Sequence, residues 1–210
     1  MTRPQALSAG VAALLVVPLA VLVRLGWDPL ADADRSADDQ AQRLMRRHGT
    51  LLAWVRSASH LGDPLVVTAI VAAVALGCWL AHRRTDAIYL LAVRAVAVVV
   101  DFLLKEGVAR ARPNLAQPVA HASGYSFPSG HALGSAATYL SLALVVGWPR
   151  PLVTRLVVAT AVLVAIVVAV TRVLLGVHFP SDVVAGLLLG WAIALVLRSA
   201  VAARRIGAGD

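Results

Sequence analysis

The sequence contains little charge and few aromatic residues. Only 14% of its 210 residues are charged and 5% are aromatic, whereas 60% are apolar. A soluble domain of this length needs a larger share of charged residues to cover its surface. The composition therefore excludes an ordinary soluble domain and indicates an integral membrane protein.

Cysteine and lysine are nearly absent as well. The single cysteine, Cys78, excludes a disulfide framework, and its position in an apolar run predicts a buried, unreactive thiol. Lys105 is the only lysine among 19 basic residues, and the formal net charge is +8. The arginines stand mainly beside the apolar runs rather than in one soluble cluster. This pattern indicates contact with anionic lipid headgroups and not with nucleic acid.

Six apolar segments are long enough, or nearly so, to cross a bilayer as helices. They are residues 6–23, 64–81, 87–104, 131–146, 152–170 and 183–197. The fourth and sixth reach full length if the polar residues before them form the first helical turn. Because backbone groups in lipid must pair within their own segment, we expect an all-α bundle of six transmembrane helices forming one domain, residues 1–210. The first segment is expected to stay as an uncleaved helix, since the cleavage-like Ala31-Asp32-Ala33 lies too far beyond its end.

The only long polar segment, residues 27–63, lies between the first two spans. Ser36 followed by Asp39 resembles a capping box at the start of a helix. Mostly apolar positions then recur at helical spacing: Ala37, Ala41, Leu44, His48, Leu51 and Val55. The pattern predicts an amphipathic helix at the membrane interface, with Trp27 and Trp54 at headgroup depth. A simple connecting helix is the alternative.

The distribution of basic residues bears on orientation. With the N-terminus inside the cell, eight basic residues fall in inner segments and ten in outer ones, so raw counts do not follow the positive-inside rule. The two short inner loops, residues 82–86 and 148–151, carry little charge other than arginine. This density favours a multi-pass protein of the cell membrane with both termini inside.

Three polar clusters interrupt the apolar pattern. The first runs from Lys105 to Pro113 at the end of the third span, and the second, residues 124–131, opens the fourth. The third runs from Thr171 to Asp182, between the fifth and sixth spans. In a six-span chain these span ends share one membrane face, so the three clusters are expected to meet. If the N-terminus is inside, they meet on the outer face.

The cations of these clusters suit a phosphate group. Lys105, Arg112 and Arg172 supply three positive charges, and guanidinium groups match phosphate oxygens in bidentate geometry. Ser129 and Gly130 precede a helix, where a hydroxyl and backbone amides can face an anion at the positive helix end.

Two histidines accompany the cations. His178 and Asp182 are four residues apart, so the carboxylate can orient one ring nitrogen and leave the other as a nucleophile. His131 could then protonate the departing oxygen and activate water. Positioning and charge stabilisation account for most of the catalysis of phosphoryl transfer, so no metal ion or other cofactor is expected.

The order Lys-x6-Arg-Pro, Pro-Ser-Gly-His and Arg-x5-His-x3-Asp resembles the signature of the type-2 phosphatidic acid phosphatase superfamily, over residues 101–190. One departure is Thr171, which stands where the family usually has serine. The resemblance implies a membrane lipid phosphatase similar to undecaprenyl-diphosphate or phosphatidylglycerol-phosphate phosphatases. It implies that His178 is the nucleophile that becomes a phosphohistidine, Asp182 its orienting partner and His131 the general acid. It also implies phosphate binding by Lys105, Arg112, Ser129, Gly130 and Arg172.

Other polar residues have simpler interpretations. Asp101, one turn before Lys105, is expected to hold that lysine in position, and Arg94 to meet a buried carbonyl or carboxylate. Arg110 is expected to meet lipid headgroups. The remaining histidines are expected at the surface or interface: His48, His60, His82 and His121. Tyr125 and Phe127 are expected to belong to a connecting loop.

Three other functions remain open. A vanadium haloperoxidase would share the pocket, but such enzymes are soluble. A lipid phosphotransferase would share the histidine mechanism and differ only in its acceptor. A transporter or anion-binding membrane protein would place polar residues near the bilayer midplane, whereas here they cluster at span ends. The sequence leaves the oligomeric state and the lipid undecided, since undecaprenyl diphosphate, phosphatidic acid and phosphatidylglycerol phosphate all carry a terminal phosphate.

Overall fold

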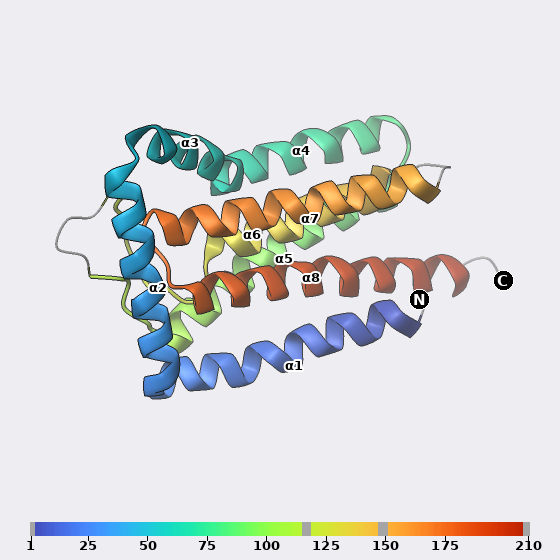
Figure 1. Ribbon diagram of the computed structural model, residues 1–210. Coiled ribbons are helices and arrows are strands. Elements are labelled where there is room, and N and C mark those ends of the chain that lie inside the picture. Colours follow the sequence, from blue (N-terminus) through green and yellow to red (C-terminus); the bar gives the residue numbers. More distant parts are fainter. Residues whose placement is uncertain (1–2, 115–118, 147–150, 208–210) are drawn as a thin grey trace.

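The computed structural model describes residues 3–114, 119–146 and 151–207, and the regular elements within these ranges are all helices. They are α1 (Arg3–Leu25), α2 (Asp28–Arg47), α3 (Gly49–Ser59), the short 3-10 helix η1 (His60–Gly62), α4 (Pro64–Leu80), α5 (Arg84–Val108), α6 (Gly130–Val146), α7 (Pro151–Leu174) and α8 (Pro180–Gly207). The long helices α1, α4, α5, α6, α7 and α8 run side by side, and α2 lies across one end of the bundle (Figure 1). Both chain termini lie at the opposite end (Figure 1).

All six predicted apolar segments are helical. By length and composition α5, α7 and α8 can each cross a membrane. The number rises to five if two bent pairs, residues 14–47 with a 90° bend and residues 49–80 with a 45° bend, each count as one span. The polar motif before α8 does form its first turn, as predicted. Pro128 and Ser129 stay outside α6, which is a shorter apolar helix of 17 residues.

The helix α6 forms the centre of the bundle, and eleven of its residues are buried. Two glycines of α8 let it approach α6 closely. A Cβ atom on Gly186 would lie 2.7 Å from the Ser129 carbonyl oxygen, and one on Gly190 would lie 2.5 Å from that of Leu133. Small residues four apart permit such contact between membrane helices. The close packing places Asp182, at the start of α8, beside Ser129, whose amide donates to the Asp182 carbonyl at 3.0 Å.

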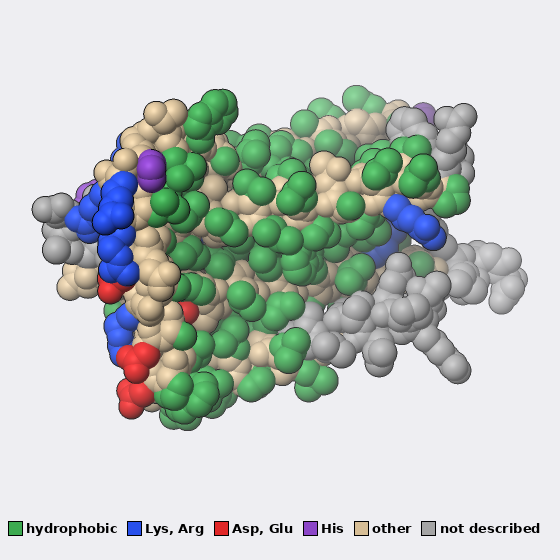
Figure 2. Space-filling view, viewed as in Figure 1, with side chains coloured by type: hydrophobic (Ala, Val, Ile, Leu, Met, Phe, Trp, Pro, Cys, Tyr) green, Lys and Arg blue, Asp and Glu red, His purple; other side chains and the backbone are tan. Residues whose placement is uncertain are grey.

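The outer surface of the bundle is apolar along its length. Apolar side chains cover the sides of the helices, whereas charged ones gather over α2 (Figure 2). Leu65 and Leu152, for example, expose 81% and 67% of their surface. Soluble monomers rarely expose apolar patches of this extent, so the surface fits a protein surrounded by lipid. Cys78 is buried within α4, as predicted.

The segment between the first two spans differs from its predicted form. Ser36 lies two turns inside α2, so the predicted capping box is wrong; Pro29 marks the true start of the helix. The buried face of α2 is mainly polar, because this helix crosses helix ends whose backbone groups lack partners. Asp34 accepts from the Ser181 amide of α8 at 3.0 Å, and Gln42 donates to the Leu174 carbonyl of α7 at 3.2 Å.

Candidate active site

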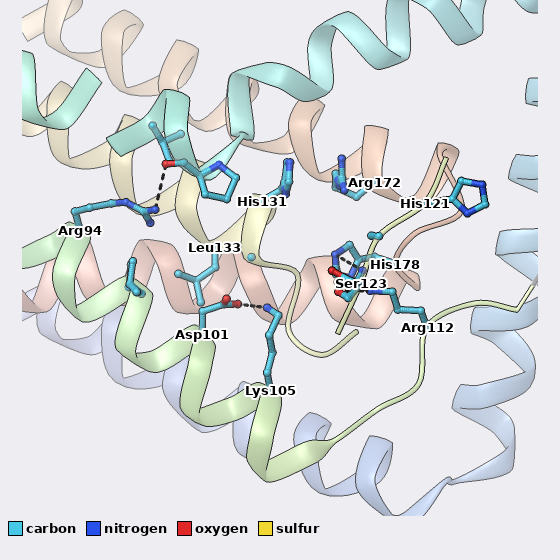
Figure 3. Close-up of a pocket in the computed structure, with 16 residues that line it drawn as sticks. Arg94, Asp101, Lys105, Arg112, His121, Ser123, His131, Leu133, Arg172 and His178 are labelled. Carbon is cyan, nitrogen blue, oxygen red and sulfur yellow. Dashed lines mark hydrogen bonds and ion pairs between the residues drawn. The ribbon is translucent and has the colours of Figure 1, made fainter. Parts of the chain in front are cut away.

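A cavity of about 540 Å³ opens near the α2 end of the bundle. Its lining draws on all three polar clusters, so the structure brings together side chains that are far apart in the sequence (Figure 3). The predicted site residues that line it are Lys105, Arg112, Gly130, His131, Arg172 and His178. Ser129 and Asp182 are buried behind it.

His178 lies in the loop between α7 and α8 and is 2% exposed. Its Nδ1 is 2.8 Å from the Ser126 carbonyl oxygen and 3.6 Å from Oδ2 of Asp182. Both oxygens accept hydrogen bonds, so the ring proton belongs on Nδ1 and the lone pair on Nε2. Burial lowers the pKa of His178 to about 4, which keeps the ring neutral at physiological pH. The ring therefore presents Nε2 as a base or nucleophile, 3.1 Å from Nη1 of Arg112.

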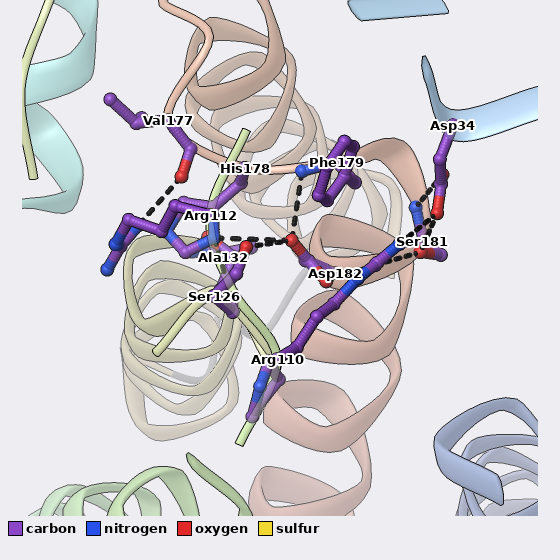
Figure 4. Close-up of polar contacts among 12 residues, drawn as sticks. Asp34, Arg110, Arg112, Ser126, Ala132, Val177, His178, Phe179, Ser181 and Asp182 are labelled. Atoms are coloured by element: carbon purple, nitrogen blue, oxygen red, sulfur yellow. Dashed lines mark hydrogen bonds and ion pairs between the residues drawn. The ribbon is translucent and has the colours of Figure 1, made fainter. Parts of the chain in front are cut away.

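Asp182 is the centre of a buried polar network (Figure 4). Its carboxylate accepts from the Phe179 amide at 2.9 Å and from the Ser126 hydroxyl. Ser126 therefore contacts His178 through its carbonyl and Asp182 through its hydroxyl. Ser126 could not be identified from the sequence, because a serine in a connecting loop carries no signal of such contacts.

Arg110 completes this network. Its Nη1 donates to Asp182 at 2.6 Å, and its Nη2 donates to Asp34 of α2 at 2.7 Å. The guanidinium also lies over the Phe179 ring, 4.2 Å from its centroid. The expectation that Arg110 meets lipid headgroups is therefore wrong. Two buried carboxylates need a cation, and Arg110 is the one placed to pair with both.

The two arginines beside His178 are held by neutral oxygens. Arg112 donates to the carbonyls of Ser123, Gly124 and Val177, at 3.0, 3.0 and 2.7 Å. Arg172 donates to the Ser59 hydroxyl at 2.6 Å, and its buried Nε has no hydrogen-bond partner in the described part of the chain. Within the described ranges no carboxylate lies within ion-pair distance of either guanidinium. Their positive charge is thus left for a ligand.

Two further cations have partners of the expected chemical type. Lys105 pairs with Asp101 and also donates to the Pro128 carbonyl at 3.0 Å, which confirms that Asp101 holds this lysine. Arg94 donates to the Pro64 carbonyl at 3.3 Å, and in addition to the Thr68 hydroxyl at 2.8 Å. The predicted carbonyl partner of Arg94 is present, but it belongs to the exposed Pro64, so the expectation of a buried partner is wrong.

His131 lies in the first turn of α6. Its Nε2 is 2.8 Å from Oδ1 of Asp63, whose other oxygen contacts Nδ1 of His60 at 2.6 Å. The sequence Asp63-Pro64 marks a helix start, but it does not reveal the contact with a histidine 68 residues later. Asp63 is thus a third acid of the site, beside Asp101 and Asp182, and no local pattern in the sequence indicates its role.

Ser129 and Gly130 differ in their placement. Gly130 lines the cavity, where a Cβ atom would lie 3.1 Å from Oδ2 of Asp101. The Ser129 hydroxyl instead faces the Ala132 amide at 3.5 Å, and its own amide is bonded to Asp182. In this geometry Ser129 acts at the start of α6 rather than in the cavity.

Of the residues expected in loops and at the surface, some are exposed as expected and others line the cavity or are buried. His48, His60 and His82 are exposed, as expected. His121 is exposed too, but it also lines the cavity. Phe127 is fully buried in an apolar cluster with Val16 of α1, so it anchors the loop before α6.

Known proteins share this sequence and fold. The family model of the PAP2 superfamily matches residues 86–206. Phosphatidylglycerophosphatase B of Bacillus subtilis is 30% identical over 164 residues, covering 76% of this chain and 80% of the relative. Decaprenylphosphoryl-5-phosphoribose phosphatase of Mycobacterium tuberculosis is 33% identical over 155 residues, covering 71% and 80%. The crystal structure of a transmembrane PAP2-type phosphatidylglycerolphosphate phosphatase from Bacillus subtilis matches with a TM-score of 0.83 and 26% identity, over 91% of this chain and 94% of that one. The chain belongs to the PAP2 superfamily.

Proposed function

We propose that this phosphatase removes the terminal phosphate of a membrane lipid through a phosphohistidine at His178. The observation that carries the proposal is the orientation of its ring. Nδ1 is held by the Ser126 carbonyl and the Asp182 carboxylate, so the lone pair of Nε2 faces Nη1 of Arg112 at the cavity. Arg112 and Arg172, which edge the cavity there, have no acidic partner among the described residues. A nucleophile oriented by a second group is the arrangement that covalent catalysis needs.

The proposed reaction has two steps, formation of the phosphohistidine and its hydrolysis. In the first, Nε2 of His178 attacks phosphorus, the ester P–O bond breaks, and His131 donates a proton to the leaving lipid oxygen. In the second, His131 takes a proton from water, the resulting hydroxide attacks phosphorus, and the P–N bond breaks to release inorganic phosphate. Asp182 and Ser126 stabilise the Nδ1–H of the ring throughout.

The cations supply the charge stabilisation. Arg112, Arg172 and Lys105 surround the phosphate position, and phosphoryl transfer spreads negative charge over the equatorial oxygens. Three side-chain cations can meet this need without a metal ion. We therefore expect phosphate release to continue in EDTA, and loss of activity that magnesium restores would contradict this part of the proposal.

For topology, we propose that all six long helices span the membrane, with both termini in the cytoplasm and the site on the outer face. An even number of spans puts both termini on the same side of the membrane. The cavity lies at the opposite end of the bundle from both termini (Figure 1), which supports its placement on the other side. Single cysteines at Ser123 and Arg84, in a Cys78→Ala background, test it in intact cells. A membrane-impermeant thiol reagent should label position 123 and not position 84. The reverse labelling would mean that the protein has the opposite orientation in the membrane.

For the substrate, the similarity to phosphatidylglycerophosphatase B and to decaprenylphosphoryl-5-phosphoribose phosphatase supports a lipid that carries a phosphate beyond its headgroup linkage. The direct test is phosphate release by the purified protein from phosphatidylglycerol phosphate, phosphatidic acid and undecaprenyl diphosphate. Release that requires His178 and leaves an acid-labile phosphoprotein on rapid quenching is expected. Release that persists in His178→Ala would overturn the covalent mechanism.

A further inference from the structure

Arg94 is a charged residue of the cavity lining to which the proposed reaction assigns no task. It lines the same cavity as His178 but comes from the middle of α5, eleven residues before Lys105. Figure 3 shows it across the cavity from Arg112 and His178, with His131 and Asp101 between them. An ionisable residue within a membrane helix is costly to keep, so one that faces a cavity indicates function.

The contacts of Arg94 leave part of its guanidinium unused. Nε donates to Thr68 and Nη2 to the Pro64 carbonyl, both neutral groups of α4. Nη1 has no hydrogen-bond partner in the part of the chain that the structure describes, and a Cβ atom on Gly134 would lie 3.7 Å from it. Like Arg112 and Arg172, Arg94 has no described carboxylate within ion-pair distance.

The charge of the cavity exceeds what one phosphate can match. Lys105 and Asp101 form an ion pair with no net charge, so Lys105 can donate a hydrogen bond to the phosphate without adding to the net charge of the lining. The three arginines of the lining have no such partner among the described residues. A terminal phosphate monoester carries a charge of about −1.5 to −2 at neutral pH. Arg112 and Arg172, beside His178, match that charge. Arg94 remains, and a single additional negative charge would match it.

The position of Arg94 sets the distance between the two anions. Gly130 lines the cavity beside His131, and Gly134, which Nη1 approaches, lies four residues later in α6. Along α6, a rise of about 6 Å therefore separates the level of Gly130 and His131 from that of the guanidinium, and the two phosphates lie at least this far apart. This spacing suits two phosphates joined by a short polyol, whereas the two phosphorus atoms of a diphosphate lie closer together.

Arg94 also lies where the polar part of a lipid would end. Together with Val98 it lines both the cavity and an apolar groove of about 420 Å³ between α4 and α5, whose other lining residues include Val71, Leu91 and Val99. A phosphate at Arg94 would be the one next to the apolar tails.

We propose that Arg94 forms a second phosphate-binding site, which takes the phosphodiester of a lipid whose terminal phosphate lies at His178. This inference rests on the proposed phosphatase activity and adds a selectivity for lipids with two phosphates separated by a polyol. Charge-assisted hydrogen bonds contribute about 1.5–3 kcal/mol, so losing them should lower the rate about 10- to 150-fold.

The test compares lipids within each protein variant. Phosphatidylglycerol phosphate and phosphatidic acid with identical acyl chains are hydrolysed in mixed micelles by wild type, Arg94→Gln, Arg94→Lys and Arg198→Gln. Arg94→Gln should lower kcat/KM at least tenfold for phosphatidylglycerol phosphate and less than threefold for phosphatidic acid. Arg94→Lys should keep an intermediate preference. Arg198→Gln removes an arginine at the far end of the bundle and should leave the ratio unchanged.

The outcomes distinguish failure of the second phosphate-binding site from failure of the proposed phosphatase activity. Equal losses on both lipids in Arg94→Gln would show a purely structural contact between α4 and α5 and overturn the inference, as would no loss on either. If Arg94→Gln lowered kcat/KM more for undecaprenyl diphosphate than for phosphatidylglycerol phosphate, the proposed selectivity for two phosphates separated by a polyol would be wrong. If wild type hydrolyses none of these lipids, the proposed function itself fails.

A measurement on wild type alone guards against misfolded variants. A phosphatidylglycerol phosphate analogue whose inner phosphate is methylated carries no charge at that position and keeps the terminal phosphate. Its kcat/KM should be at least tenfold below that of the natural lipid. Equal values would overturn the second site even if no Arg94 variant folds.

Discussion

The two ends of the helix bundle use arginine in opposite ways. At the end that holds both termini, Asp86 of α5 is paired with Arg83 at 2.9 Å and with Arg198 of α8 at 3.0 Å. Around the cavity that opens toward the other end, Arg94, Arg112 and Arg172 donate to carbonyl and hydroxyl oxygens instead. The first arrangement neutralises charge and ties helices together, whereas the second keeps charge available.

The difference explains how an apolar bundle can hold cations for a ligand. A buried cation must have its donors satisfied, or the desolvation cost is large. Neutral acceptors satisfy part of the donors without cancelling the charge, so the remaining attraction is directed at an anion in the cavity. Arg110 is the contrasting case at the site end. Asp34 and Asp182 neutralise its charge, and it is not part of the cavity lining.

The largest effect is expected from the nucleophile. His178→Ala should reduce phosphate release by about 10⁴-fold or more, because loss of a nucleophile removes the covalent route entirely. The protein should still elute as a folded species in size-exclusion chromatography, since His178 lies in a loop between helices. Release within tenfold of wild type would remove His178 from the reaction.

The next effect contrasts one arginine from each end. Arg112→Gln should lower kcat/KM about 10²-fold, because it removes preorganised donors from the developing charge. Arg83→Gln, the matched control at the end that holds both termini, should change kcat/KM less than twofold and lower the Tm instead. Steady-state kinetics and thermal unfolding in detergent measure both. If the two variants lost activity equally, the distinction between the two ends would be wrong.

The third effect concerns the arginine that is fully paired. Arg110→Gln should lower kcat about tenfold by freeing Asp182, and it should also lower the Tm by several degrees, because two carboxylates lose their cation. The double variant Asp34→Asn, Arg110→Gln should lose less stability than the sum of the single changes. Strict additivity would indicate that Asp34 and Arg110 act independently.

Much of this site could be predicted from the sequence, because the three motifs are local patterns and the order of spans brings them to one end. The apolar runs likewise predict the six helices to within a few residues at most ends. Contacts that join distant segments could not be predicted in this way. Arg110 and Arg112 are both arginines of the same loop, and only packing decides that one faces buried carboxylates and the other the cavity. The polar face of α2 has the same origin, since its partners are the ends of α7 and α8.

The smallest effect concerns Asp38, an acid that forms no ion pair with the residues that the structure describes. Asp38 lies on the buried face of α2, is 4% exposed, and its Oδ1 has no hydrogen-bond partner among those residues. Burial, together with the neighbouring charge of Asp39, raises the pKa of Asp38 from 3.8 to about 6. Because the folded pKa lies above the unfolded one, the stability that the protonated form provides is complete below about pH 4 and is lost as the pH rises through about 6.

Asp38→Asn should remove this dependence. The variant should be more stable than wild type at pH 8 by about 1 kcal/mol, less than a two-unit shift would give, because water reaches the adjacent surface of α2 and screens the charge. At pH 4.5 the two proteins should have nearly the same Tm. Asp39→Asn, one position along on the exposed face, is the control and should have a smaller effect. Thermal unfolding of the three proteins between pH 4.5 and 8 measures the difference. A gain of the same size at every pH would mean that Asp38 does not change its protonation state over this range, which would contradict its raised pKa.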